Sequence, residues 1–93
     1  MKLSGNTIFI TGGGSGIGRG LAEALHKLGN QVIISGRRKG HLEAVVKANQ
    51  GMQSVELNVE DPASIAGVAE HLIANYPKLN VLCNNAEIGR AHV

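Results

Sequence analysis

The sequence feature that most constrains the fold is a glycine-rich turn between an apolar segment and an amphipathic one. Residues 6–11 contain an apolar run, Ile8-Phe9-Ile10, among β-branched residues, which predicts a strand, and an apolar stripe over positions 16–28 predicts a helix. In parallel α/β sheets, a strand followed by a tight turn and a helix N-terminus presents backbone N–H groups to a phosphate. We therefore expect a phosphate-binding loop at the glycines, which are Gly12, Gly13, Gly14, Gly16, Gly18 and Gly20.

Strands and helices are predicted to alternate along the rest of the chain. Segments 31–35, 53–58 and 80–85 have strand character, and segments 41–49 and 62–75 have helical periodicity. The order β-α-β-α-β-α-β with right-handed crossovers predicts a three-layer α/β fold with a parallel sheet of order 3-2-1-4. We expect this fold to be truncated, because another strand belongs on the outer edge of the fourth.

Helix ends and buried faces are also predicted. Asp61 is the expected N-cap of the last helix, Pro62 lies in its first turn, and Gly29 is expected to end the first helix. The apolar positions expected to face the core are Ile17, Leu21, Ala24, Leu25 and Leu28 in the first helix; Leu42, Val45 and Val46 in the second; Ile65, Val68, Ala69, Leu72 and Ile73 in the third; and Val55, Leu57 and Val59 in the third strand.

Composition places the chain among small globular domains. It has 93 residues, of which 43% are apolar and 17% charged, and only Phe9 and Tyr76 are aromatic, so the core must be aliphatic. No apolar run approaches the ~18 residues of a membrane span, and the first residues lack a hydrophobic signal region. We expect a cytoplasmic protein. Cys83, the single cysteine, lies in an apolar strand and is expected to be a small core residue.

Two motifs resemble those of the short-chain dehydrogenase/reductase family. They are Thr11-Gly12-Gly13-Gly14-Ser15-Gly16-Ile17-Gly18 and, after the fourth strand, Asn84-Asn85-Ala86, and the resemblance covers residues 1–86. It implies a Rossmann-like fold, a nicotinamide cofactor, hydride transfer between a carbonyl and an alcohol, and a homo-oligomeric parent protein. It also implies that the cofactor-binding residues include Gly12, Ser15, Gly16, Ile17 and Gly18 on the pyrophosphate and adenosine side, and Asn84 and Ala86 further along the cofactor.

The exit of the second strand favours NADP over NAD. NAD binding usually requires an acidic residue there to hydrogen-bond the ribose 2′-hydroxyl. This chain instead has Gly36 followed by Arg37, Arg38 and Lys39, and guanidinium groups bind a 2′-phosphate through forked hydrogen bonds. We expect Arg37 to be the main partner and Arg38 the second. The alternative is a solvated basic turn, and the scarcity of aromatic residues argues against nucleic acid as its partner.

Other polar residues give weaker predictions. Asn58 stands where the family usually has an Asp near the adenine, so Asn58 is either a cofactor contact or only the end of its strand. His26, His41 and His71 are expected to have surface roles rather than to bind a ligand. No cluster suggests a metal site.

The residues that perform the family's reaction are missing from this chain. That reaction uses a Ser, and a Tyr followed four positions later by a Lys. The single tyrosine, Tyr76, is followed four positions later by Asn80 and precedes the fourth strand, which is the wrong place. We therefore expect no catalytic residue in these 93 residues and no turnover.

The end of the sequence departs from the family pattern. Glu87 replaces the glycine expected after Ala86, and residues 88–93 can be encoded by ATCGGAAGAGCACACGTC, which matches a common sequencing adapter. The two preceding adapter bases, AG, complete a GAG codon for Glu87. Residues 1–86 are thus expected to be the N-terminal part of a cofactor-binding domain and residues 87–93 a non-native tail, with a divergent natural tail as the alternative.

Three functional hypotheses remain at this point. The leading one is the cofactor-binding half of an NADP-dependent short-chain oxidoreductase. The second is a non-catalytic NADP-binding or sensing half-domain, and the third is an inert truncation product that folds poorly because its sheet edge is exposed. An NADPH titration together with circular dichroism separates them.

Overall fold

The computed structural model describes residues 4–14 and 16–84 and contains four strands and three helices in these ranges. In chain order they are β1 (Thr7–Thr11), α1 (Gly16–Lys27), β2 (Gln31–Gly36), α2 (Lys39–Ala48), β3 (Gln53–Glu56), α3 (Pro62–Asn75) and β4 (Val81–Asn84). The expected cofactor contacts of Ser15 and Ala86, and the expected tail over residues 87–93, lie outside the described residues. Within the described ranges, no helix is long and apolar enough to cross a membrane.

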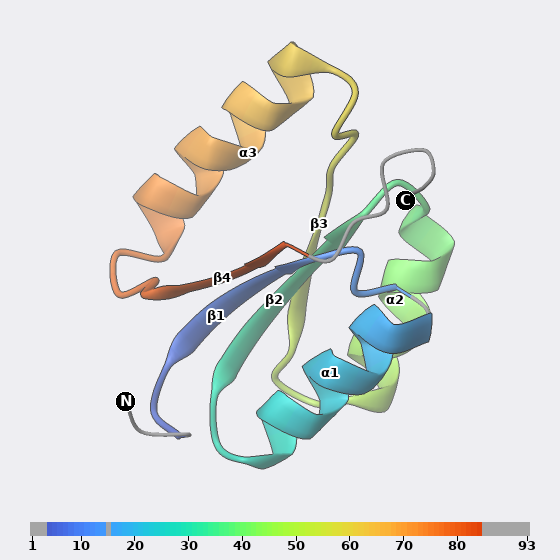
Figure 1. Ribbon diagram of the computed structural model, residues 1–93, viewed down its shortest axis with the longest axis vertical. Helices are drawn as coiled ribbons and strands as arrows, with labels where there is room; N and C mark the ends of the chain where they lie inside the picture. Colours follow the sequence, from blue (N-terminus) through green and yellow to red (C-terminus); the bar gives the residue numbers. More distant parts are fainter. Residues whose placement is uncertain (1–3, 15, 85–93) are drawn as a thin grey trace.

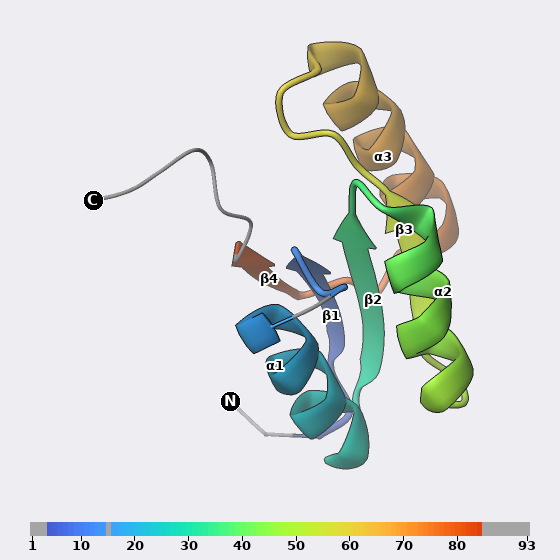
Figure 2. The same ribbon diagram turned by 90° about the vertical axis from the view of Figure 1, so that its right-hand side faces the viewer.

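The four strands form one parallel sheet with the order β3-β2-β1-β4, which confirms the predicted topology. Helices α1 and α2 cover one face and α3 covers the other, so the fold has three layers (Figures 1 and 2). In the register of the sheet, Thr11 lies opposite Ser35 on one side and Asn84 on the other. The carboxyl ends of β1, β2 and β4 therefore meet at one edge, where parallel α/β proteins bind ligands.

An aliphatic core fills both faces of the sheet. Alternate residues of β1 and β2 point to opposite sides, as the pleat requires. One cluster joins Ile8, Ile10, Val32 and Ile34 to Ala22, Leu42, Val45 and Met52, and the other joins Phe9 and Ile33 to Leu57 and Leu72. The half-buried Cys83 packs against the first cluster, as expected of a small core residue.

The buried face of α1 differs from the predicted one. Gly18 and Ala22 are its buried residues, whereas Ile17 is 83% exposed and Leu28 is 49% exposed. Leu21 and Ala24 are exposed as well, and of the predicted stripe only Leu25 packs against the core. The small residues Gly18 and Ala22 allow the axis of α1 to lie close to the sheet. Because this face of the helix packs on the sheet, the larger side chains, such as Ile17 and Leu21, lie on the exposed side.

The predicted faces of the other helices are confirmed in part. In α2, Leu42 and Val45 are buried and Val46 packs against the core. In α3, Leu72 is buried and Val68 packs beside it. The remaining predicted positions of α3 are exposed, because α3 touches the sheet along a narrow stripe; they are Ile65, Ala69 and Ile73.

Local signals in the sequence place the helix ends well. Asp61 Oδ1 accepts a hydrogen bond from Ala63 N–H at 3.0 Å, and Pro62 is the first residue of α3, as predicted. Gly29 has a φ of 93° directly after α1, which is the left-handed conformation of a helix stop. Helix α2 begins at Lys39, two residues earlier than predicted, and β3 ends at Glu56, two residues earlier.

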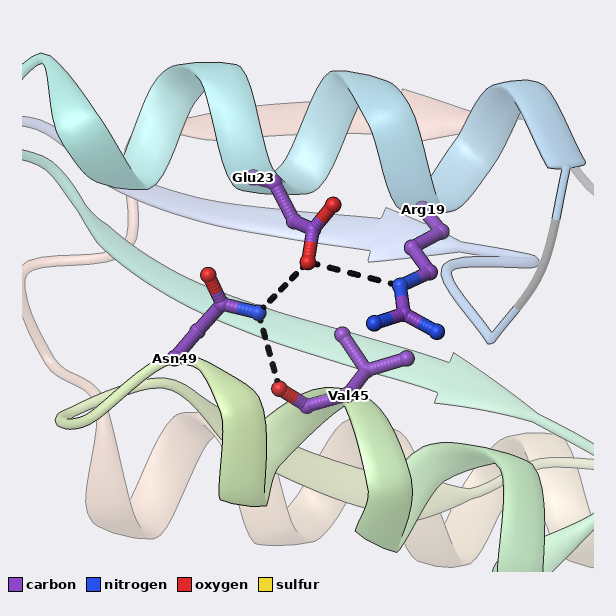
Figure 3. A network of polar contacts seen from close by, with 4 residues as sticks. All are labelled: Arg19, Glu23, Val45 and Asn49. Carbon is purple, nitrogen blue, oxygen red and sulfur yellow. Dashed lines mark hydrogen bonds and ion pairs between the residues drawn. The ribbon is translucent and has the colours of Figure 1, made fainter.

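A polar network joins α1 to α2 (Figure 3). Asn49 Nδ2 donates to Glu23 Oε2 at 2.8 Å and to the carbonyl of Val45 at 2.9 Å. Arg19 Nε donates to the same Glu23 oxygen at 3.3 Å. The hydrogen bond from Asn49 lowers the pKa of Glu23 from its usual 4.5, against some desolvation, and the positive charge of Arg19 lowers it further. Ionised Glu23 therefore ties the two helices of this layer together.

Replacing Glu23 tests the network through the pH dependence of stability. Because the folded state holds the pKa of Glu23 below 4.5, its contribution is present above that pH and is lost as the pH falls through the folded pKa. We expect the Glu23→Gln variant to melt below the parent chain at pH 7 and the difference to shrink toward pH 3.5, measured by circular dichroism. The control is Glu70→Gln, at an exposed position of α3. A difference that stays constant over this pH range would contradict the assignment.

Candidate functional site

A hollow of about 420 Å³ lies at the carboxyl edge of the sheet. Four segments line it: the end of β1 with the glycine loop, the β2–α2 turn, the start of α2, and the chain just after β3. These segments are distant in sequence and meet only because β1, β2 and β3 are parallel neighbours. The hollow is therefore formed by the sheet topology, at the edge where the sequence places its phosphate-binding loop.

The glycine loop is held against the end of β2 by backbone hydrogen bonds. The N–H groups of Gly12 and Gly13 both donate to the carbonyl of Ser35, at 2.8 and 3.0 Å. Gly12 has a φ of 73°, a conformation that other residues rarely adopt. A Cβ on Gly13 would lie 2.5 Å from Ile34 Cγ2, which is closer than atoms can pack. The loop can take this path only with glycine at both positions.

The β2–α2 turn gives the hollow its charge. Gly36, Arg37 and Arg38 all line it, and both arginines are exposed. Within residues 4–14 and 16–84, no carboxylate lies within ion-pair distance of either guanidinium group. A Cβ on Gly36 would sit 3.4 Å from Leu42 Cδ2, inside the hollow, so glycine keeps this space open. The turn is therefore a roomy, positively charged site.

Apolar side chains line the side of the hollow next to β3. Leu42 and Leu57 are buried and Val59 is half-buried, and all three belong to the lining. The N–H of Leu57 donates to the carbonyl of Gly36 at 2.8 Å, which fixes the chain after β3 beside the β2–α2 turn. An apolar surface beside a charged turn suits a flat ring attached to a phosphate. Apolar periodicity predicts these residues for the core and does not show their second role, because it cannot tell which core residues border a hollow.

His41 is exposed, as expected, and it also lines the hollow. It is the third residue of α2, and a Cβ on Gly14 would lie 3.4 Å from its Cβ. The helix begins earlier than predicted, at Lys39, so its first turn carries His41 toward the glycine loop. The sequence pattern did not indicate this earlier helix start, and so it did not place His41 beside the glycine loop.

The residues named from the sequence have different positions relative to the hollow. Gly12, Arg37 and Arg38 line it, while Gly16, Ile17 and Gly18 form the first turn of α1. Asn84 ends β4, where its Oδ1 accepts a hydrogen bond from Thr11 Oγ1 at 3.0 Å.

Asn58 makes local contacts next to the hollow. Its Oδ1 accepts a hydrogen bond from the N–H of Glu60, and its own N–H donates to Ser64 Oγ, both at 3.0 Å. The neighbouring residues Leu57 and Val59 line the hollow. Asn58 thus shapes the turn that follows β3, and this turn presents the two apolar side chains.

Tyr76 lies at the opposite end of the sheet. Its hydroxyl donates to Gln53 Oε1, at the first residue of β3, whereas the hollow lies beyond the last residue of that strand. Burial raises the pKa of Tyr76 above its usual value of 10. Tyr76 is therefore a structural residue at the amino edge, in agreement with its unfavourable position in the sequence. Within residues 4–14 and 16–84, no three His, Cys, Asp or Glu side chains come together as metal ligands.

The strand order, the crossovers and the glycine loop define a Rossmann-like α/β protein. The chain belongs to the short-chain dehydrogenase family, whose model matches residues 6–93. It is 41% identical over 88 residues to the uncharacterized oxidoreductase DltE of Bacillus subtilis, covering 95% of this chain and 35% of that protein. It is 37% identical over 93 residues to the 3-oxoacyl-[acyl-carrier-protein] reductase FabG of Escherichia coli, covering 97% of this chain and 37% of that protein. The chain thus spans little more than a third of the length of these relatives.

Solved structures show the same architecture. A 3-ketoacyl-(acyl-carrier-protein) reductase from Brucella melitensis, complexed with NADH, superposes with a TM-score of 0.85 at 32% identity over 96% of this chain and 37% of its own. A short chain dehydrogenase from Shigella flexneri, complexed with NADP, has a TM-score of 0.84 at 26% identity over 91% of this chain and 38% of its own. Structures with this fold thus include complexes with either dinucleotide.

Substitution of Gly13 tests the close approach of the glycine loop to β2. In Gly13→Ala, the new Cβ meets Ile34, and we expect a loss of about 1–3 kcal/mol in the free energy of unfolding, as for an overpacked core. Urea denaturation followed by circular dichroism measures it. The matched control is Gly20→Ala in α1, where a Cβ meets nothing within 4 Å and helix propensity favours alanine by roughly 0.5–1 kcal/mol. Equal stability of the two variants would contradict the described packing.

Proposed function

We propose that this chain is the cofactor-binding part of an NADP(H)-dependent short-chain oxidoreductase. The observation that carries the proposal is the pair Arg37 and Arg38, which line the same hollow as the glycine loop and have no carboxylate partner within the described residues. A dinucleotide phosphate carries its negative charge at two places, the pyrophosphate and the 2′-phosphate. The glycine loop, which leads to the N-terminus of α1, is proposed to meet the pyrophosphate, and the two arginines are proposed to meet the 2′-phosphate.

The residues present fit this cofactor. Gly12 and Gly13 bring the backbone close to where a pyrophosphate would lie, and Gly36 leaves space where a 2′-phosphate would enter. Arg37 is the main proposed partner of that phosphate and Arg38 the second, while Leu57 and Val59 would face the adenine ring. Once bound, the nicotinamide supplies the hydride that the family's reaction transfers.

The remaining cofactor contacts are proposed from the family resemblance. The described members of this set lie in the first turn of α1, in the turn after β3 and at the end of β4. The full set is Ser15, Gly16, Ile17, Gly18, Asn58, Asn84 and Ala86.

Charge supports NADP as the cofactor. Similar structures include one in complex with NADH and one in complex with NADP, so membership of the family leaves the choice open. In this chain the β2 exit has two guanidinium groups and no acidic residue to accept a hydrogen bond from a 2′-hydroxyl. A phosphate dianion gains charge-assisted hydrogen bonds there that a hydroxyl does not.

Catalysis is proposed to depend on residues outside these 93. The 93 residues contain no Tyr-x-x-x-Lys, and Tyr76 is bonded to Gln53 at the amino edge. We therefore propose that the chain binds the dinucleotide without turning over a carbonyl substrate. A binding or sensing module is the second candidate, favoured by the formed hollow in a chain that lacks the catalytic residues.

Reversing the charge of Arg37 tests the cofactor assignment. We expect Arg37→Asp to weaken NADPH binding roughly 10- to 100-fold, as expected for the loss of a charge-assisted hydrogen bond and its replacement by a repulsive charge. NADH binding should change less than threefold or improve, because a carboxylate accepts a hydrogen bond from the 2′-hydroxyl. Titrations of nucleotide fluorescence measure both dissociation constants.

The matched control is Lys78→Asp, which makes the same change of charge at an exposed residue before β4, at the amino edge. It should leave the ratio of NADPH to NADH affinity unchanged. An unchanged ratio in Arg37→Asp would overturn the NADP assignment. Absence of binding by a cooperatively folded chain would overturn the proposed function as a whole.

A further inference from the structure

His41 occupies a position between the two parts of the hollow proposed to bind phosphate. Its Cβ lies beside Gly14 of the glycine loop, and its residue lines the hollow together with Arg37 and Arg38. It is exposed and belongs to the first turn of α2, where backbone N–H groups favour a negative charge nearby. An anion bound to the two arginines would therefore lie within the same small cavity as the imidazole.

The described groups around His41 provide positive charge and no negative partner. The β2–α2 turn contributes Arg37 and Arg38, Lys39 begins α2, and the lining residues of the glycine loop and of the chain after β3 are uncharged. The carboxylates on the surrounding elements lie outside the lining. Glu23 of α1 is hydrogen-bonded to Arg19 and to Asn49 at the far end of α2. The others, which are Glu43 of α2, Glu56 of β3, and Glu60 and Asp61 in the turn after β3, are exposed. A bound phosphate is thus the anion available to a protonated imidazole.

The two arginines and His41 carry side-chain groups that differ in how their charge depends on pH. Guanidinium groups stay charged at all accessible pH values, whereas imidazole is the side chain that usually changes charge between pH 5 and 8. A phosphate monoester carries between one and two negative charges in the same range. The charge of an imidazole therefore varies over this pH range, while the charge of the arginines remains constant.

We propose that His41 is a third ligand of the 2′-phosphate, and that it makes the affinity of this chain for 2′-phosphorylated nucleotides depend on protonation. This inference rests on the proposed function and adds to it a residue and a regulation by pH. A protonated imidazole adds a positive charge beside the phosphate, whereas a neutral one offers a single hydrogen-bonding group. The share of the discrimination against NAD(H) that His41 supplies is consequently greatest under mildly acidic conditions.

The test compares the parent chain with His41→Gln across the pH range. The probe is 2′,5′-ADP, which carries the 2′-phosphate without the nicotinamide, and isothermal titration calorimetry measures its dissociation constant from about pH 6 to about pH 8.5. We expect His41→Gln to weaken binding about fivefold or more at pH 6 and less than twofold at pH 8.5, as for the loss of one charge-assisted hydrogen bond. Taking the ratio of the two chains at each pH cancels the protonation of the phosphate itself.

Two further variants make the result specific. His41→Arg carries a permanent charge, and we expect it to bind at pH 8.5 at least as tightly as the parent chain does at pH 6. His71→Gln replaces an exposed histidine on α3, a helix that contributes no residue to the lining of the hollow, and should follow the parent chain at every pH. The probe 5′-AMP, which lacks the 2′-phosphate, should show no pH-dependent difference between the parent chain and His41→Gln.

The possible failures are distinguishable. If 2′,5′-ADP binds and Arg37→Asp weakens it, but the ratio for His41→Gln is the same at pH 6 and pH 8.5, the role of His41 is overturned and the proposed function stands. If the same pH-dependent ratio appears with 5′-AMP, His41 acts on another part of the nucleotide and the inference is also overturned. If a folded chain does not bind 2′,5′-ADP, the proposed function fails and this inference fails with it.

Discussion

The carboxyl edge of this protein depends on one close backbone approach, that of the glycine loop to the end of β2. Two successive N–H groups, of Gly12 and Gly13, share the carbonyl of Ser35, and Gly13 lies where any side chain would overlap Ile34. This contact satisfies a carbonyl at the end of a buried strand and fixes the loop in space. The turn after β2 is also held in place, because the next carbonyl, that of Gly36, accepts a hydrogen bond from the N–H of Leu57. Backbone hydrogen bonds therefore fix the glycine loop and the chain after β3, two of the segments that border the hollow.

Helix packing holds the walls of the hollow in place. Gly18 and Ala22 let α1 approach the sheet closely, and the hydrogen bond from Asn49, the C-cap of α2, to Glu23 ties α2 to α1. The network lies at the far end of α2 from the hollow and restrains the helix as a unit, while buried apolar residues anchor the end that borders the cavity. Ionised Glu23, whose pKa is lowered, thus helps to hold α2 in place, and the first turn of α2 borders the hollow.

Electrostatics distinguishes the two edges of the sheet. The carboxyl edge carries the glycine loop, the first turns of α1 and α2, and the arginines after β2, and all of these favour an anion. The amino edge carries Tyr76 and Gln53, which satisfy each other by a hydrogen bond. The fold alone leaves the choice of dinucleotide open, as the NADH and NADP complexes among similar structures illustrate. The side chains at the β2 exit are the feature of this chain that bears on that choice.

The sequence by itself determined the order of elements, the strand order and the helix caps, because these follow from local periodicity, from Asp61 and Gly29, and from the handedness of crossovers. It also placed the glycine loop and Arg37 after adjacent strands. Only the tertiary structure decided which face of α1 is buried, because the stripe of large apolar residues gave way to close packing through Gly18. Only the tertiary structure placed His41 in the hollow, because its lining comes from segments that meet through the parallel pairing of strands, which local sequence does not encode.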